Sequence, residues 1–189
     1  MPLPLLELLD RCLDHAATVV AGIRDDQRTA PTPCPDLTVD QLLVHLVGGL
    51  KWYGQLPAGG PGDPRDVPAS RLAPLSYPDA FAEVRTLIRS TWSPARLTDR
   101  YPMPGGEVTG AGMTEYMVVE VLGHAWDLAV ATGQPTDPPG GVAEDALGVA
   151  RGLGEEALRA PGMMGPAVPV DPDAPAIDRF AAFLGRTVN

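Results

Sequence analysis

Clusters of proline and glycine divide this sequence into segments with helical periodicity, and this division limits the folds open to the chain. Residues 4–26 carry apolar side chains three or four positions apart, a spacing typical of an amphipathic helix. The stretch TAPTPCPDL then ends that helix, because proline cannot continue the helical hydrogen bonding. Thr38 and Gln41 form a capping-box pattern, which predicts a second helix that runs to about Tyr53.

The same periodicity returns in the rest of the chain. It predicts helices over 77–92, 113–132 and 141–159, and a short terminal helix over 176–186. No part of the sequence alternates strand and helix patterns, and there is no internal repeat. We therefore expect an all-α fold, a four-helix bundle with an extra C-terminal helical and extended segment. We expect residues 1–189 to form a single domain.

Two connections between these helices have distinctive compositions. The connector 57–76 is rich in proline and glycine, and it either spans one end of the bundle or covers a site; we favour the first. The turn-rich stretch RYPMPGGEVTGAG predicts a short hairpin around Gly105 and Gly106. Arg71 and Arg100, in or beside these connections, are the cations we expect nearest to the mouth of any site there.

Charge and hydropathy exclude several classes of function. The formal net charge is −10 and the isoelectric point about 4.6, so nucleic acid and anionic membranes are poor partners. No apolar run approaches the roughly 18 residues of a membrane span. The N-terminus has no basic region followed by an apolar one, so we expect a cytoplasmic protein, either a monomer or a homodimer.

The segment EYMVVEVLGHAWDLAVATG, residues 115–133, places polar groups on an apolar helix face. Glu120 and His124 lie one turn apart on that face, and Asp127 lies close to His124. A buried carboxylate is costly unless it is paired or bound to a metal. The predicted helix has no lysine or arginine, so the partner of Glu120 must come from elsewhere in the fold.

His45 is a candidate for that partner, because it shares the apolar face of the second predicted helix with Leu42 and Leu46. We therefore expect His45 to point inward. It is either a hydrogen-bonded core histidine or a metal ligand together with Glu120 and His124. Two histidines and one carboxylate with open positions are typical of a catalytic zinc site. The spacing of Glu120 and His124 alone is weak support, since it is common by chance.

Three other residues admit two interpretations each. Asp127 either accepts a hydrogen bond from His124, and so supports a metal ligand from behind, or plays a structural role such as capping a neighbouring helix. His15 has no acidic partner on its own helix face, which favours a structural role. Cys34 lies between two prolines, away from a helix N-terminus that would activate its thiol, so a structural role is again favoured.

Three stretches of this sequence resemble one family: PTPCPDLTVDQLLVHLVGG, EVLGHAWDLAVATGQP and the closing DRFAAFLGR. Together and in this order they are similar to metal-binding proteins related to mycothiol-dependent maleylpyruvate isomerase, in the DinB/YfiT-like superfamily. The resemblance implies a DinB-like four-helix bundle that binds a divalent metal. Zinc is most expected, with nickel, iron or manganese also possible. The ligands it implies are His45, Glu120 and His124.

The sequence also departs from the family. Leu37 stands where the family usually has tryptophan, and the basic residue expected near Asp40 is absent. The isomerase carries a further C-terminal domain that supplies a substrate-binding arginine, whereas this sequence ends at Asn189. Maleylpyruvate is therefore not carried over as the substrate.

Three functions are compatible with these residues and with the resemblance. The first is a metal-dependent transferase or isomerase that uses a low-molecular-weight thiol such as mycothiol on a small molecule. The second is a non-catalytic metal-binding module that senses or binds a small ligand. The third is a bundle without metal, which requires Glu120 to be exposed or paired with arginine. Motifs of other enzyme classes are missing, among them G-x-S-x-G, the Walker A loop and H-E-x-x-H.

Overall fold

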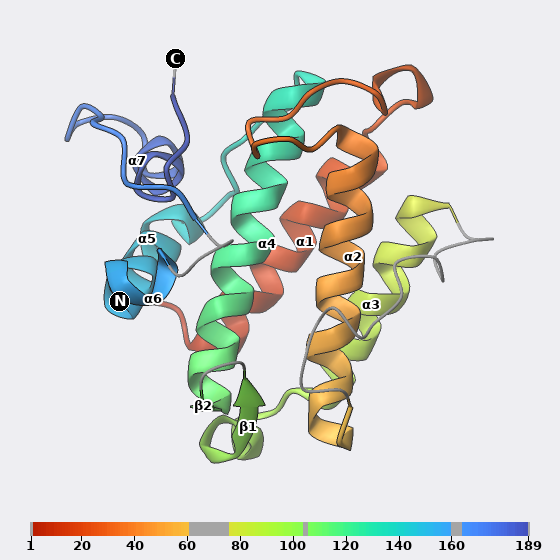
Figure 1. Ribbon diagram of the computed structural model, residues 1–189, viewed down its shortest axis with the longest axis vertical. Coiled ribbons are helices and arrows are strands. Elements are labelled where there is room, and N and C mark those ends of the chain that lie inside the picture. Colours follow the sequence, from red (N-terminus) through yellow and green to blue (C-terminus); the bar gives the residue numbers. More distant parts are fainter. Residues whose placement is uncertain (1, 61–75, 104–105, 160–163, 189) are drawn as a thin grey trace.

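Four long helices form a bundle in the computed structural model, which describes residues 2–60, 76–103, 106–159 and 164–188. The helices are α1 (Leu5–Ala21), α2 (Val39–Gln55), α3 (Tyr77–Thr91) and α4 (Gly110–Thr132). Helix α1 packs against α4 and α3, and α2 packs against both α3 and α4 (Figure 1). This arrangement confirms the prediction of an all-α four-helix bundle.

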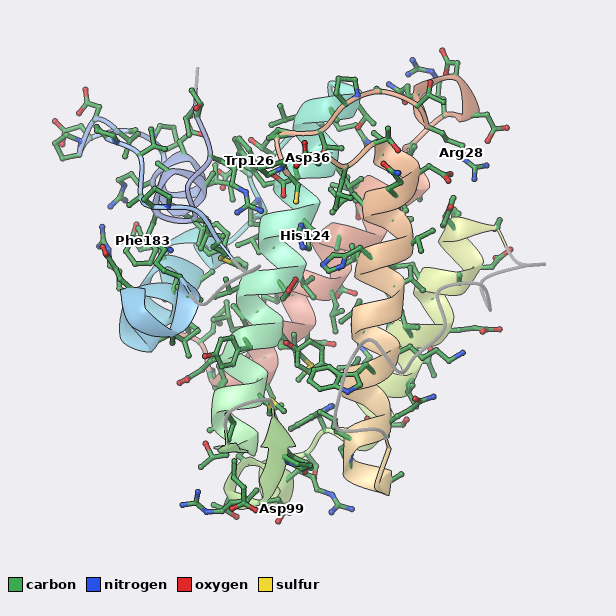
Figure 2. All side chains as sticks on the ribbon, in the orientation of Figure 1. Arg28, Asp36, Asp99, His124, Trp126 and Phe183 are labelled. Carbon is green, nitrogen blue, oxygen red and sulfur yellow. The ribbon has the colours of Figure 1, made fainter. Side chains whose placement is uncertain are left out.

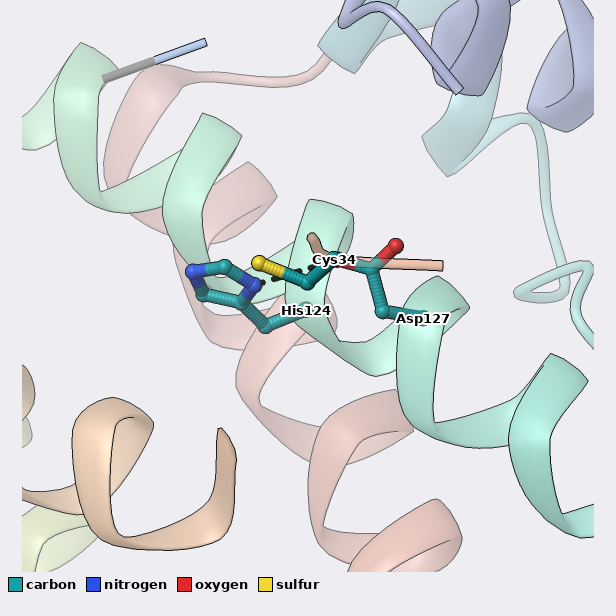
Figure 3. A group of neighbouring side chains, drawn as sticks. All are labelled: Cys34, His124 and Asp127. Carbon is teal, nitrogen blue, oxygen red and sulfur yellow. Dashed lines mark hydrogen bonds and ion pairs between the residues drawn. The ribbon is translucent and has the colours of Figure 1, made fainter. Parts of the chain in front are cut away.

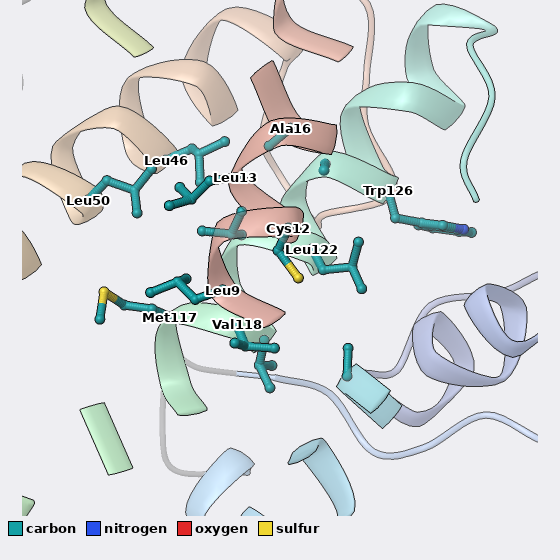
Figure 4. Close-up of a cluster of buried hydrophobic side chains, with 14 of the residues drawn as sticks. Leu9, Cys12, Leu13, Ala16, Leu46, Leu50, Met117, Val118, Leu122 and Trp126 are labelled. Carbon is teal, nitrogen blue, oxygen red and sulfur yellow. The ribbon is translucent and has the colours of Figure 1, made fainter. Parts of the chain in front are cut away.

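Helix α4 is the central element of the bundle. It is buried along nearly its whole length, because α1, α2 and α5 (Val142–Leu153) all pack against it. Figure 4 shows the apolar side chains that α1, α2 and α4 contribute to the core between them, among them Leu13, Leu46 and Leu122. Cys12 lies in the same core, where burial raises the pKa of its thiol to about 12. A charged side chain on the buried part of α4 is therefore costly unless it has a partner inside the protein.

Smaller elements complete the fold around this bundle. Strands β1 (Arg100–Met103) and β2 (Gly106–Thr109) form the expected antiparallel hairpin, with Tyr101 opposite Val108; Gly105 lies outside the described residues. Helix α5 is followed by the short α6 (Glu155–Leu158) and, after an extended stretch, by α7 (Ala176–Phe183). This C-terminal part lies beside α4, on the side away from α2 and α3 (Figure 1).

Several helix boundaries differ from the predicted ones. The first helix ends at Ala21, with Gly22 as its C-cap; Gly22 lies against the Gln134 side chain, and a Cβ there would come within 2.1 Å of Oε1. The segment 141–159 is divided into α5 and α6 at Gly154, whose positive φ of 82° interrupts the helix. The terminal helix ends before Gly185, which also has a positive φ, of 86°.

The central helix begins three residues earlier than predicted. The Thr109 hydroxyl accepts a hydrogen bond from the backbone N–H of Gly112 at 3.2 Å, so Thr109 is the N-cap. Gly110 follows in a tight contact with the segment before the hairpin. A Cβ at Gly110 would lie 2.0 Å from the carbonyl oxygen of Arg96, so only glycine fits there.

We predict opposite stability changes for two glycine-to-alanine substitutions. Gly110→Ala should lower the free energy of unfolding by about 1–3 kcal/mol, because a methyl group has no room beside the Arg96 carbonyl. Gly148→Ala, on the exposed face of α5 with nothing near its Cβ position, should raise it by about 0.4–1 kcal/mol. Urea unfolding followed by circular dichroism measures both. A neutral or stabilising Gly110→Ala would contradict this contact.

Candidate metal centre

His45 on α2 and Glu120 and His124 on α4 meet between the two helices. His124 Nε2 lies 3.1 Å from Glu120 Oε2, and His45 Nε2 lies 3.9 Å from the same oxygen. The two imidazole rings are nearly perpendicular, with centroids 5.0 Å apart. One possible ligand atom from each residue lies within 4.8 Å of the others. The fold thus brings together the three residues that the sequence singled out as candidate ligands.

The prediction that His45 points inward is wrong, because its side chain is 51% exposed. The buried face of α2 is formed by Leu42, Leu43, Leu46, Val47 and Leu50. At 100° per residue, the centre of that face lies more than a quarter-turn from His45. His45 therefore lies beside α4 and outside the core, with its ring against that of His124 and about half of its side chain exposed to solvent.

Glu120 is also less buried than the sequence suggested, with 28% of its side chain exposed. Burial raises the pKa of Glu120, but the charge and hydrogen bond of His124, with help from His45 and Arg186, outweigh it and bring the pKa to about 2. In return, burial lowers the pKa of His124, but Glu120, Asp127 and Cys34 raise it well above its ordinary value. Burial and the nearby His124 lower the pKa of His45.

His124 meets a second carboxylate through its other ring nitrogen. Its Nδ1 lies 3.2 Å from Asp127 Oδ2, and since a carboxylate only accepts, Nδ1 carries the proton. This contact is the one expected of a residue that supports a metal ligand from behind, and it leaves Nε2 directed toward Glu120. Figure 2 shows His124 on the side of α4 that faces α2.

Arg186 lies behind Asp127, and no sequence pattern predicted its role there. Asp127 is completely buried, and Arg186 donates to it twice, from Nε to Oδ1 at 3.2 Å and from Nη2 to Oδ2 at 2.9 Å. One signal was present, since Arg186 ends the stretch DRFAAFLGR that carries part of the family resemblance. Nothing in its local sequence separates Arg186 from an exposed arginine, so its burial depends on tertiary structure.

Cys34 forms a second cluster with His124 and Asp127, shown in Figure 3. One possible ligand atom from each lies within 4.8 Å of the other two. The sequence favoured a structural role for Cys34 and did not associate it with His124. Asp127, however, already accepts both donors of Arg186, so a cation in this cluster would be held close to a guanidinium. The cluster of His45, Glu120 and His124 has no such cation in direct contact among the described residues.

Three other residues lie away from these clusters or outside the described chain. His15 lines a surface cavity of about 440 Å³ between α1 and the segment that follows α4. Arg100 pairs with Thr109 at the start of the hairpin, and His124 lies roughly 20 Å farther along α4, so Arg100 is too remote to attract a ligand to this site. Arg71 and most of the 57–76 connector lie outside the described residues.

Comparisons with known proteins give the family of this chain. The model of the mycothiol maleylpyruvate isomerase N-terminal domain matches residues 9–129, which include His45, Glu120 and His124. The chain belongs to this family. Two proteins of Mycobacterium tuberculosis described as uncharacterized, MT0763 of strain CDC 1551 and Rv0738 of strain H37Rv, are each 36% identical to it. Each alignment covers 95% of this chain and 96% of the relative.

A solved structure supports the same fold. The crystal structure of the mycothiol-dependent maleylpyruvate isomerase is similar to this chain with a TM-score of 0.55, over 78% of this chain and 68% of the other. The sequences are only 19% identical, so this likeness concerns the fold, and it confirms the DinB-like helical bundle. The family match ends at residue 129, and the single-domain organisation of residues 1–189 stays a prediction.

We predict that ionised Glu120 makes the stability of the metal-free protein depend on pH in the acid range. The folded pKa of Glu120 is about 2, below its ordinary value of 4.5, so its contribution to stability is present above pH 4.5 and lost as pH falls toward 2. Glu120→Gln has no such charge to lose. We expect its free energy of unfolding to fall less than that of the wild type across this interval.

Urea unfolding of metal-stripped protein at several pH values measures this difference. Glu83→Gln, which changes an exposed glutamate on α3, serves as the control and should follow the wild-type pH dependence. Identical slopes for Glu120→Gln and the wild type would show that Glu120 is not stabilised by His124.

Proposed function

We propose that this protein binds one divalent metal ion, most readily zinc, through His45, Glu120 and His124. The observation that carries the proposal is the convergence of these three side chains from two helices. Two imidazoles and one carboxylate form the donor set of a catalytic zinc site, which keeps at least one position open. Nickel, iron(II) and manganese accept the same donors, so the ion in the cell is a separate question.

The distances between the donors are compatible with this ion. Ligand atoms at about 2.0–2.1 Å from a tetrahedral zinc ion are roughly 3.3 Å apart. The distance from Glu120 Oε2 is 3.1 Å to His124 Nε2 and 3.9 Å to His45 Nε2, so one contact already has this value and the other needs a small adjustment. His45 has the freedom for it, because its side chain is half exposed.

The proposed site has a closed side and an open side. His124 is only 7% exposed, and Asp127 behind it is completely buried, whereas Glu120 and His45 lead outward to solvent. A small molecule would reach the ion past the exposed side of His45. This asymmetry favours a site that exchanges a ligand over a closed structural site.

We further propose that the ligand is a low-molecular-weight thiol and that the protein is a thiol-dependent transferase or isomerase. Family membership and the fold shared with a mycothiol-dependent maleylpyruvate isomerase support this proposal. A divalent ion lowers the pKa of a thiol that binds to it, and so favours the nucleophilic thiolate. In this chain, His45 and Glu120 would line the approach of the thiol, and Asp127 would fix the proton of His124 on Nδ1.

The metal proposal predicts which substitutions empty the site. Purified wild type should contain about one zinc per chain after loading and dialysis, as measured by plasma mass spectrometry. Glu120→Gln and His124→Ala should retain little metal, because each removes one of three ligands. His15→Ala, which changes a histidine outside the site, should retain the wild-type content. Loss of metal from His15→Ala but not from Glu120→Gln would contradict the ligand set.

The thiol proposal predicts a binding reaction that needs both the ion and His45. Calorimetric titration with mycothiol should give heat with the zinc-loaded wild type and none with the metal-stripped protein or with zinc-treated His45→Ala. Glutathione and cysteine test whether the response depends on the sugar-linked part of mycothiol. Metal content without any thiol binding would favour the non-catalytic module. Equal heats with loaded and stripped protein would exclude a role for the ion.

A further inference from the structure

Arg186 is a buried arginine whose contacts lead directly to the proposed metal centre. Its side chain is 6% exposed, and each nitrogen of the guanidinium has a partner. Nε and Nη2 donate to the two oxygens of Asp127, and Nη1 donates to the Leu184 carbonyl at 2.8 Å. The guanidinium is thus held at two points, by a carboxylate on α4 and by its own chain just after α7.

The paired contact fixes the plane of the Asp127 carboxylate. Two parallel hydrogen bonds from a guanidinium fork orient a carboxylate more tightly than one bond does. Asp127 Oδ2, which accepts from Arg186, also lies 3.2 Å from Nδ1 of His124. The orientation of the carboxylate therefore sets the orientation of the imidazole ring. That orientation in turn directs His124 Nε2 at Glu120.

The path of the C-terminal segment explains how Arg186 reaches this position. Leu184 packs against α4 at Gly123, the residue before His124, where a Cβ would lie 3.1 Å from Leu184 Cδ1. Gly185 turns the chain with a positive φ and approaches Gly165 so closely that a Cβ there would lie 2.9 Å from its carbonyl carbon. The Arg186 N–H then donates to the Ala181 carbonyl at 3.0 Å.

We propose that Arg186 is a positioning residue for the metal centre and acts through Asp127 and His124. It does not contact the proposed ion or a substrate. The C-terminal segment thereby becomes a part of the site, although it lies on the opposite side of α4 from His45. This inference rests on the proposed function, because it assumes that His124 binds a metal.

A purely structural ion pair is the alternative role for Arg186. Net stabilisation by a buried ion pair is small, because desolvation offsets much of the attraction. A second arginine provides the control: Arg179 on α7 pairs with Glu144 of α5 at 2.6 Å and donates to the carbonyl of Ala174, just before α7, at 3.0 Å. It touches neither Asp127 nor His124 among the contacts of the described chain, so it reports the effect of loosening α7 alone.

The experiment measures metal binding directly, with Co²⁺ and Zn²⁺ as the probes and thermal unfolding in parallel. Arg186→Met should weaken Zn²⁺ binding about 10- to 100-fold, the range typical for loss of a partner that orients a metal ligand. It should also change the visible absorption bands of bound Co²⁺, which report ligand geometry. Arg179→Met should keep the wild-type affinity and spectrum, whatever its effect on the unfolding temperature.

Further variants test whether Arg186 acts on the metal centre through Asp127. Arg186→Lys keeps the charge but not the fork, so its affinity should lie between those of the wild type and Arg186→Met; it also serves if Arg186→Met does not fold. If Arg186 acts through Asp127, the double variant Arg186→Met/Asp127→Asn should bind no more weakly than Asp127→Asn alone.

The outcomes separate this inference from the proposed function. A wild type that binds neither ion overturns the proposed function itself. If the wild type binds Zn²⁺ and the Arg186→Met or Arg186→Lys variant has the same affinity and Co²⁺ spectrum, only the proposed role of Arg186 is overturned. Equal losses of affinity in Arg186→Met and Arg179→Met overturn it as well, because they would reflect the stability of the C-terminal segment.

Discussion

Asp127 is completely buried, and its need for partners inside the protein organises the contacts around His124. A carboxylate without solvent must be paired, and α4 has no lysine or arginine. Arg186 from the C-terminal segment and His124 from the next turn of α4 meet this requirement together. The same contacts that stabilise the charge hold the His124 ring with Nε2 toward Glu120. Burial of one acidic side chain therefore orders a neighbouring site on the same helix, one to two turns away.

The two ring nitrogens of His124 lie in different environments. Its Nδ1 side is enclosed by Asp127, Arg186 and Cys34, while its Nε2 side opens through Glu120 and His45 to solvent. The enclosed side has no room to exchange ligands without disturbing a buried ion pair. On the open side, the pKa of the Glu120 carboxyl and the pKa of His45 are both lowered. At neutral pH the carboxylate is therefore ionised and the imidazole neutral, as metal ligands must be. This difference is why we assign the ion to the open side.

Sequence patterns predicted the bundle and the meeting of His45, Glu120 and His124, because both depend on helical periodicity. The same patterns failed where a single helix face does not decide the outcome. His45 lies at the edge of the α2 face, so its exposure depends on how closely α4 packs there. Cys34 reaches His124, and Arg186 reaches Asp127, from segments far away in sequence, and no local pattern encodes such contacts. Helices ended at Gly154 and Gly185 earlier than the apolar spacing suggested, because both glycines adopt a positive φ that the spacing of apolar residues does not reveal.

We propose that nitrogen and oxygen donors on the open side of His124 hold the ion. X-ray absorption spectroscopy at the zinc edge, on zinc-loaded protein in thiol-free buffer, tests it most directly. We predict nearest neighbours of nitrogen and oxygen alone at about 2.0–2.1 Å, with the more distant scattering of two imidazoles. A sulfur atom at about 2.3 Å, with the scattering of only one imidazole, would contradict the claim and place the ion with Cys34, His124 and Asp127.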